Sequence, residues 1–480
     1  MLFLFMLQSK GTTKIGYAFG PLLFIWFITI AAFGLNQILH TPVVLKAFHP
    51  YYAYHFFITQ GMRGYFLLGG IFLVVTGGEA MYADIGHFGK NPIRYSWFLI
   101  VLPSLLLSYF GQGAHLISHP EAVHNPFYML PPTWFVVPML CLATIATLIA
   151  SQAVISATFS LTKQAILLGL CPRFPVIQTS RYHYGQIYIP QMNFLLLLGT
   201  LVLILHFRNS SALAHAYGIA VNLEMLLVTI MIAYAARQVW HWPLSWVIGV
   251  FGVFYTIDLA FLGANVHKFL SGGWMPVVFA CVVAFFMYTW CMGMEYLKHN
   301  FYRKKTEISK VAKQLNYKTL NRLPNVTAIF ITDIYDNSGG SFLHFLKLAL
   351  SVPEHILIVN YAMHNIPHVE ENAHIEIHQI DKMIHQLTLH YGFMDTVSIP
   401  KGLARVNKEQ TLPFEVNVDA ATYLVEIPHI IATKEKKNLL LRWQYEIFTF
   451  LMRNYSANLN IEFYQLPLNR TIAIGTYCII

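Results

Sequence analysis

The sequence predicts an all-α polytopic membrane domain followed by a C-terminal α/β domain in water. Its 480 residues are 56% hydrophobic, only 11% charged and have a mean hydropathy of +0.52, whereas about one quarter of the residues of soluble proteins are charged. Residues Met1–Met294 hold 12 Lys/Arg and 5 Asp/Glu, and Glu295–Ile480 hold the other 19 Lys/Arg and 17 Asp/Glu. We therefore expect a transmembrane domain over 1–294 and an aqueous domain over 295–480.

Eight segments of the first domain reach the length of about 20 apolar residues that a membrane span requires. Trp97, Trp134, Trp242 and Trp274 stand at segment starts, where amphipathic rings prefer the membrane interface. Residues Met1–Leu7 are too short to span, and we interpret them as the end of a helix. The eight predicted spans are Ile15–Leu35, Gly64–Tyr82, Tyr95–Ile117, Trp134–Leu161, Ile187–Phe207, Ser211–Ala236, Trp242–Ala264 and Trp274–Met294.

Basic residues in alternate connections predict the orientation. One side carries eight Lys/Arg and the other only four, Lys46, Arg63, Arg208 and Lys268. Because cytoplasmic loops are enriched in Lys and Arg, both termini and the domain over 295–480 are predicted to be cytoplasmic. The net charge of +9 is thereby explained by topology, and a nucleic-acid partner is not expected, because the basic residues do not cluster with aromatic stacking platforms.

The second domain has an open α/β pattern. Gly339-Gly340, which follows Asp333, fits a turn better than a nucleotide-binding loop, and the domain carries no catalytic signature, so an enzyme is not expected. Neither the five cysteines nor the histidines, such as His374 and His378, have the partners of a zinc site. The predicted strands are Asn325–Ile331, His355–Tyr361, His374–Ile380 and Thr422–Ile427, and the predicted helices are Ser341–Ser351 and Asn438–Asn454.

Acidic residues in the membrane domain are candidates for ion or proton sites, because a carboxylate at a helix centre costs about 2.5–3.5 kcal/mol on insertion scales. Four of the five acids of this domain, Glu79, Asp84, Glu224 and Asp258, lie in or beside apolar segments. For Asp258 we favour structural pairing over a role in ion binding.

The second predicted span contains Thr76-Gly77-Gly78-Glu79 at its middle. The two glycines favour an unwound stretch whose carbonyls could face a cation, and such a break is tolerated only where it lines a cavity. Thr76 and Glu79 would add a hydroxyl and a carboxylate, the hard oxygen ligands that suit an alkali cation. The alternative is that the glycines allow close helix packing and that Glu79 bonds to a neighbouring helix.

Several ordered motifs resemble the KUP/HAK/KT family of potassium uptake transporters. They are Gly78-Glu79-Ala80-Met81-Tyr82-Ala83-Asp84-Ile85-Gly86-His87-Phe88-Gly89, Pro103-Ser104, Tyr109-Phe110-Gly111-Gln112-Gly113-Ala114, Ala150-Ser151-Gln152-Ala153-Val154-Ile155-Ser156, Gly185-Gln186-Ile187-Tyr188-Ile189-Pro190, Ala216-Tyr217-Gly218-Ile219-Ala220-Val221 and Ser271-Gly272-Gly273-Trp274. The resemblance implies a fold of the amino acid-polyamine-organocation type, with two inverted five-helix repeats and two extra helices. The eight spans would be the fifth to twelfth helices of that fold, and Met1–Leu7 the end of the fourth.

The resemblance also implies potassium uptake across the cell inner membrane, coupled to protons, with no cofactor. It supports Thr76 and Glu79 on the broken helix and Tyr217 as a phenolic ligand, although aromatic packing is an alternative for Tyr217. Asp84 is a weaker candidate, because Lys90 and Arg94 lie nearby in the sequence and favour a salt bridge. The Gly-Asp-Ile-Gly-Thr-Ser-Pro-Leu-Tyr motif of the family's first helix is absent from the sequence, so part of the cation shell is missing.

Two function hypotheses remain at this stage. The first is a potassium:proton symporter in the inner membrane bilayer. The second is a transport-inactive remnant or partner subunit that lacks the first three helices. A homodimer is compatible with either hypothesis.

Overall fold

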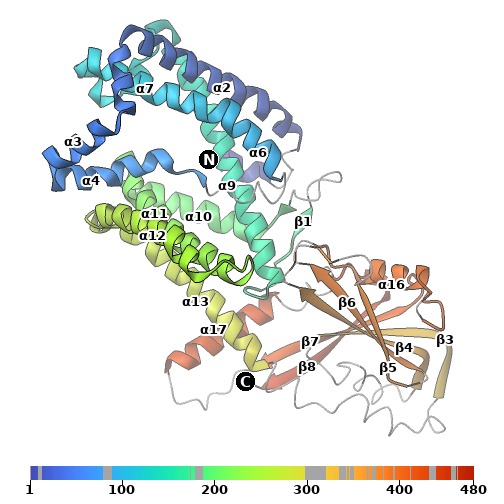
Figure 1. Ribbon diagram of the computed structural model, residues 1–480. Helices are drawn as coiled ribbons and strands as arrows, with labels where there is room; N and C mark the ends of the chain where they lie inside the picture. The colour runs from blue at the N-terminus through green and yellow to red at the C-terminus, as the bar shows by residue number, and fades with distance from the viewer. Residues whose placement is uncertain are drawn as a thin grey trace. The chain divides into compact units, whose positions relative to one another are not determined.

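The chain forms two compact units in a computed structural model (Figure 1). We call residues 1–161 and 177–281 the membrane unit, and residues 162–176 and 282–480 the sheet unit. The structure describes residues 2–8, 13–78, 89–172, 174–178, 187–297, 321–333, 342, 345, 351–364, 366, 368–369, 374–381, 383–392, 395–410, 412–431, 439–455, 461 and 463–479.

Seven helical stretches among the described residues are long and apolar enough to cross a membrane, which confirms seven of the eight predicted spans. They are Ala18–His40, Lys90–Ser118, Thr133–Leu167, Pro190–Phe207, Ser210–Gln238, Leu244–Val266 and Phe269–Leu297. Their main helices are α2 (Thr13–His40), α7 (Leu102–Ser118), α9 (Val136–Leu167), α10 (Pro190–Phe207), α11 (Ser210–Gln238), α12 (Leu244–Val266) and α13 (Trp274–Leu297).

The predicted second span, Gly64–Tyr82, is not a continuous helix. Helix α4 covers Met62–Ile71, a 3-10 turn (η3) continues over Phe72–Val75, and Thr76 is extended with φ −85° and ψ 175°. Gly77 follows with φ +101°, a conformation that strongly favours glycine. The interruption expected from Gly77 and Gly78 is therefore present. The residues from 79 to 88, which include Glu79 and Asp84, lie outside the described residues.

Glycines bring helices α2 and α7 into close contact. A Cβ atom on Gly111 would overlap the backbone of Gly34, and one on Gly34 would overlap the carbonyl of Leu107. Both obstacles are main-chain atoms, which cannot move aside by changing rotamer. Small residues at such crossings let helix backbones approach closely, as is common in membrane proteins.

The sheet unit is built on a six-stranded sheet in the order β5-β6-β4-β3-β7-β8, in which only β5 runs antiparallel to its neighbour. All four predicted strands lie within it, and α17 (Leu439–Tyr455) confirms the second predicted helix. The predicted helix Ser341–Ser351 lies almost entirely outside the described residues. The strands are β3 (Asn321–Asp333), β4 (Ser351–His364), β5 (Ile375–Gln379), β6 (Ile384–Gly392), β7 (Thr422–Ile431) and β8 (Thr471–Ile479).

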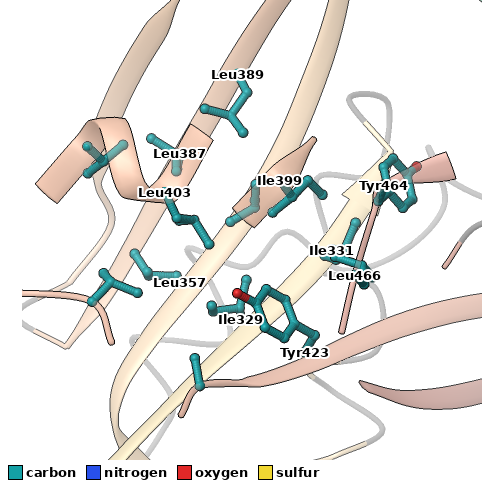
Figure 2. Close-up of a cluster of buried hydrophobic side chains, with 14 of the residues drawn as sticks. Ile329, Ile331, Leu357, Leu387, Leu389, Ile399, Leu403, Tyr423, Tyr464 and Leu466 are labelled. Atoms are coloured by element: carbon teal, nitrogen blue, oxygen red, sulfur yellow. The ribbon is translucent and has the colours of Figure 1, made fainter. Parts of the chain in front are cut away.

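Apolar side chains are buried on both faces of this sheet. Ile329 and Leu357 belong to one cluster, whereas their neighbours Phe330 and Ile358 belong to the other. Figure 2 shows the first cluster, to which helix α16 (Ile399–Lys408) contributes Leu403. Because both faces are covered, the central strands read as nearly continuous apolar runs, as parallel strands generally do.

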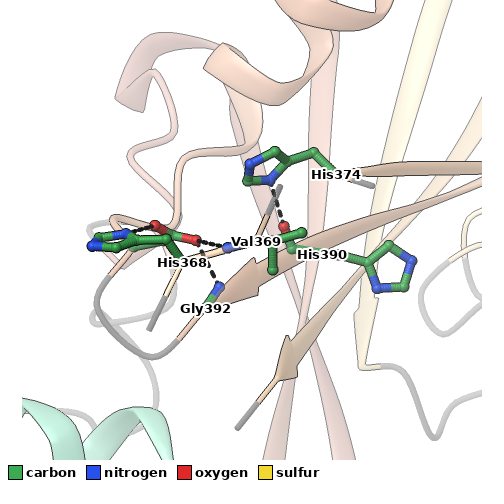
Figure 3. A network of polar contacts seen from close by, with 6 residues as sticks. His368, Val369, His374, His390 and Gly392 are labelled. Atoms are coloured by element: carbon green, nitrogen blue, oxygen red, sulfur yellow. Dashed lines mark hydrogen bonds and ion pairs between the residues drawn. The ribbon is translucent and has the colours of Figure 1, made fainter. Parts of the chain in front are cut away.

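A polar network surrounds the carboxylate of Asp395 in the sheet unit (Figure 3). His368 donates from Nδ1 to one carboxylate oxygen over 2.6 Å, and the backbone amides of Gly392 and Val369 donate to the other over 2.7 and 3.4 Å. Burial raises the pKa of Asp395, but these hydrogen bonds lower it more, so that the net pKa is below the ordinary value. The ionised carboxylate therefore stabilises the fold of this loop.

The close contact of α2 with α7 predicts that Gly111→Ala destabilises the membrane unit. Overpacking of this kind costs about 1–3 kcal/mol, because the added methyl group meets the backbone of Gly34. Thermal unfolding of the detergent-solubilised chain measures the loss. Gly199→Ala in α10 is the matched control, since its Cβ would meet no atom within 4 Å. Equal stability of the two variants would contradict the close contact.

The Asp395 network predicts a stability loss that depends on pH. Because the folded pKa is lowered, the contribution of Asp395 is present above the ordinary pKa of about 3.9 and disappears as the pH falls through the folded value. Asp395→Asn should lower the midpoint of thermal unfolding by about 2–4 °C at pH 7, for a loss of about 1 kcal/mol. The difference from wild type should shrink below about pH 4.

Asp419→Asn, which changes an exposed acid of the same unit, is the control for this measurement. If the thermal unfolding midpoints of wild type and Asp395→Asn differ by the same amount at pH 7 and at pH 3, the charge of Asp395 does not contribute to stability.

Candidate functional site

Thr76 ends the interrupted helix with its side chain folded back on it. The Oγ1 hydroxyl donates to the carbonyl of Leu73 over 2.7 Å, and the backbone amide of Thr76 donates to the same carbonyl over 3.4 Å. These two bonds satisfy a helix end that would otherwise leave a carbonyl exposed to lipid. Because the hydroxyl proton is used, the oxygen lone pairs of Thr76 remain as acceptors that a cation could approach.

Gly77 and Gly78 continue the chain past Thr76 through open space. A Cβ atom built on either glycine meets no atom within 4 Å. Gly218 and Gly69, by contrast, lie against neighbouring side chains. Among the described residues, therefore, no helix packs tightly against these two glycines.

Helix α11 passes the end of the interrupted helix at Gly218. The Cδ2 atom of Leu73 lies 3.9 Å from the position that a Cβ on Gly218 would take. The structure thus places Leu73, whose carbonyl holds Thr76, beside the Ala216-Tyr217-Gly218 segment. The Tyr217 side chain, the other described candidate, is 42% exposed. Two sequence motifs that are about 140 residues apart in the numbering are neighbours in the fold.

Asn265 at the end of α12 completes this junction and was missed by the sequence analysis. The side chain is fully buried, its Nδ2 donates to the carbonyl of Phe261 over 3.2 Å, and its Oδ1 has no hydrogen-bond partner among the described residues. Its Oδ1 lies against Gly69 of α4 and 3.7 Å from a Cβ on Gly218. A single amide in a long apolar run was the available signal, since buried polar groups in membranes usually bond across helices.

Two further polar residues of α11 lie near this junction. Asn222 is buried and donates from Nδ2 to the carbonyl of Gly218 over 2.7 Å. Glu224 is half-buried, and it follows Tyr217 by seven residues, which places the two on the same side of the helix. Glu224 and the candidate ligand Tyr217 therefore lie on the same face of α11.

Asp258 is paired between helices rather than open. Its carboxylate is 6% exposed and accepts a hydrogen bond of 2.7 Å from Thr229 of α11. A carboxylate in this setting joins α11 to α12, which agrees with the structural interpretation preferred from the sequence.

The histidines of the sheet unit do not form a metal site in the part of the chain that the structure describes. No group of three His, Cys, Asp or Glu side chains with a metal-binding arrangement occurs there. His374 instead bonds through Nδ1 to the carbonyl of His390 over 2.8 Å (Figure 3). Cys141, Cys171, Cys281 and Cys291 are free thiols.

Comparison with known proteins gives matches along the whole chain. Residues 1–295 match the family described as the K+ potassium transporter integral membrane domain, and residues 325–480 match the K+ potassium transporter C-terminal domain. These two matches together cover more than half of the chain.

Curated relatives agree with the family match. The probable potassium transport system protein Kup 1 of Legionella pneumophila (strain Paris) is 64% identical over 480 residues, which are all of this chain and 77% of the relative. Kup 2 of Legionella pneumophila subsp. pneumophila (strain Philadelphia 1) is 43% identical over 477 residues, 99% of this chain and 76% of the relative. The chain therefore belongs to the KUP/HAK/KT family of potassium transporters.

Proposed function

We propose that this potassium transporter takes up potassium together with protons, as a symporter of the cell inner membrane. The observation that carries the proposal is the interruption after Val75, held beside the Tyr217 segment of α11. A broken membrane helix with free carbonyls near the middle of a span is a common design of ion sites in secondary transporters.

The ion would bind where the described geometry offers oxygen atoms. Thr76 would contribute its hydroxyl oxygen, and the extended backbone at Thr76 and Gly77 would contribute carbonyls. The phenolic oxygen of Tyr217, which lies on the adjacent helix segment, would add a ligand. These groups would replace part of the hydration shell of potassium. A fixed set of hard oxygen ligands suits an alkali cation better than it suits a transition metal.

Glu79 is our candidate for the proton, three residues after Thr76 in the sequence. Glu79 would load a proton together with the entering potassium and would release it on the cytoplasmic side, so that both positive charges cross in the same direction. Asp84 is a weaker candidate for the same role. Each positive charge that enters gains about 2.3 kcal/mol per 100 mV of inside-negative potential.

The proposal includes a fold of inverted repeats and an orientation. Seven apolar helices and the interrupted segment are compatible with the fifth to twelfth helices of an amino acid-polyamine-organocation fold, in which the site lies between repeats at the bilayer midplane. The excess of Lys and Arg on one side supports a cytoplasmic location for both termini. The second hypothesis, a transport-inactive remnant or partner subunit, has no support from relatives that match all 480 residues.

Proton coupling can be tested in liposomes that contain the purified chain, with one dye for internal potassium and one for internal pH. An inward potassium gradient should drive potassium entry and acidify the interior. Glu79→Gln should abolish the acidification, because the amide cannot carry a proton. Glu121→Gln is the matched control. Glu121 is an acid of the same domain but lies in a short 3-10 turn, Pro120–His124, so this substitution should leave the acidification unchanged.

Potassium entry without any change of internal pH in the wild type would refute symport while leaving potassium transport intact. Equal acidification by wild type and Glu79→Gln would instead assign the proton to another group.

The pairing of Asp258 predicts a structural role that is separable from transport. Asp258→Asn keeps an oxygen that can accept from Thr229, so it should unfold and transport like wild type. Asp258→Leu leaves the half-buried Thr229 hydroxyl without its acceptor and should lower the free energy of unfolding by about 1 kcal/mol. A stable Asp258→Asn variant that no longer takes up potassium would contradict this role and place Asp258 on the ion path.

A further inference from the structure

Helix α17 has two different faces. Phe448 and Met452, four residues apart, are 1% and 5% exposed, whereas Trp443 and Phe450, seven residues apart, are 64% and 63% exposed. Residues at these spacings lie on the same side of a helix. The helix therefore buries one apolar side and presents a second apolar side, with Ile447 between Trp443 and Phe450.

The buried side packs on the last membrane helix, within the sheet unit. Phe448 contacts Trp290 of α13 with a ring separation of 5.5 Å, and Tyr445 contacts Tyr296 at 5.7 Å. The ring of Phe448 occupies the space that a side chain on Gly293 would need. Helices α13 and α17 cross each other in Figure 1, and their side chains share one buried cluster.

The contact falls at the depth where α13 leaves the bilayer. With Trp274 as its first residue, Gly293 is the twentieth residue of α13. Twenty residues of helix rise about 30 Å, which is the thickness of the hydrocarbon core. Glu295 is the next charged residue. A helix that packs against Gly293 therefore lies at the level of the lipid headgroups.

We infer that α17 is an interfacial membrane helix, whose outer face, formed by the exposed Trp443 and Phe450 with the half-buried Ile447 between them, inserts into the lipid headgroup region beside α13. Trp and Phe are the side chains that amphipathic interfacial helices bury in this layer. Glu446 and Arg453, which flank the apolar face, are exposed, as expected for side chains that reach toward water.

The charge of the surrounding sequence fits a negatively charged lipid surface. The sequence before α17 contains Lys434, Lys436 and Lys437, and Arg442 is in the first turn of the helix. Only one acid, Glu435, occurs in the same stretch of sequence. Basic residues near a membrane surface each gain about 1 kcal/mol from anionic lipids. A second copy of the chain is the competing occupant of the apolar face, and the test distinguishes the two.

The test places a spin label on the full chain, with its native cysteines replaced by serine, at Phe450→Cys in bilayer nanodiscs that contain anionic lipid. Accessibility to oxygen, which partitions into lipid, is compared with accessibility to a water-soluble nickel chelate. The label should be more accessible to oxygen than to the chelate, and a label at Trp443→Cys should behave alike. Leu468→Cys is the control, because Leu468 is a 78% exposed apolar residue of the same unit outside α17 and should report water.

Two results would overturn the inference. One is a label at residue 450 that is as accessible to the nickel chelate as the label at residue 468. The other is strong dipolar coupling between labels at residue 450 of two chains, which would assign the face to a second copy. Because no transport is measured, failure of this test leaves the proposed symport untouched.

Discussion

The arrangement of the membrane unit depends on one constraint, which is that a helix interrupted inside a bilayer must have its free backbone groups satisfied or facing a polar space. In this chain α4 and its 3-10 turn end at Val75, and Thr76 returns two hydrogen bonds to the carbonyl of Leu73. Gly77 then adopts a positive φ, and among the described residues no atom lies within 4 Å of a Cβ on Gly77 or Gly78. The chain thus stabilises the end of the broken helix at Thr76 through hydrogen bonds of its own.

Close packing around this break keeps it in place. Leu73 lies against Gly218 of α11, and the fully buried Asn265 of α12 lies against both Gly218 and Gly69. Three elements therefore meet through two glycines and one amide. A Cβ atom on Gly69 would overlap the Asn265 side chain, whereas one on Gly218 would make ordinary van der Waals contacts. This junction explains how a segment that is too short to span by itself is fixed next to the helix that carries Tyr217.

Much of this could be predicted from the sequence, because apolar run length and charge distribution report directly on the solvent. Seven spans were predicted on those grounds, whereas the interruption was predicted from the Gly77-Gly78 pair and the strands β3, β4, β5 and β7 from short strand-like runs. Strands β6 and β8 were missed although the sequence carried a signal for both, because β6 alternates polar with apolar residues and β8 is a mostly apolar run of nine residues. Asn265 was overlooked because burial of one amide is decided by helices far apart in sequence, which local patterns do not encode.

The most direct measurement of the central claim is the aqueous accessibility of the interruption, read at Gly78→Cys in the full chain in bilayers, with the native cysteines replaced by serine. No atom of the described residues lies within 4 Å of the Cβ position at Gly78, so we expect the substitution to be tolerated. A water-soluble thiol reagent should modify this cysteine, and potassium should slow the reaction whereas an equal concentration of sodium should not. A cysteine that reacts only with a lipid-soluble reagent, at a rate independent of potassium, would contradict the account.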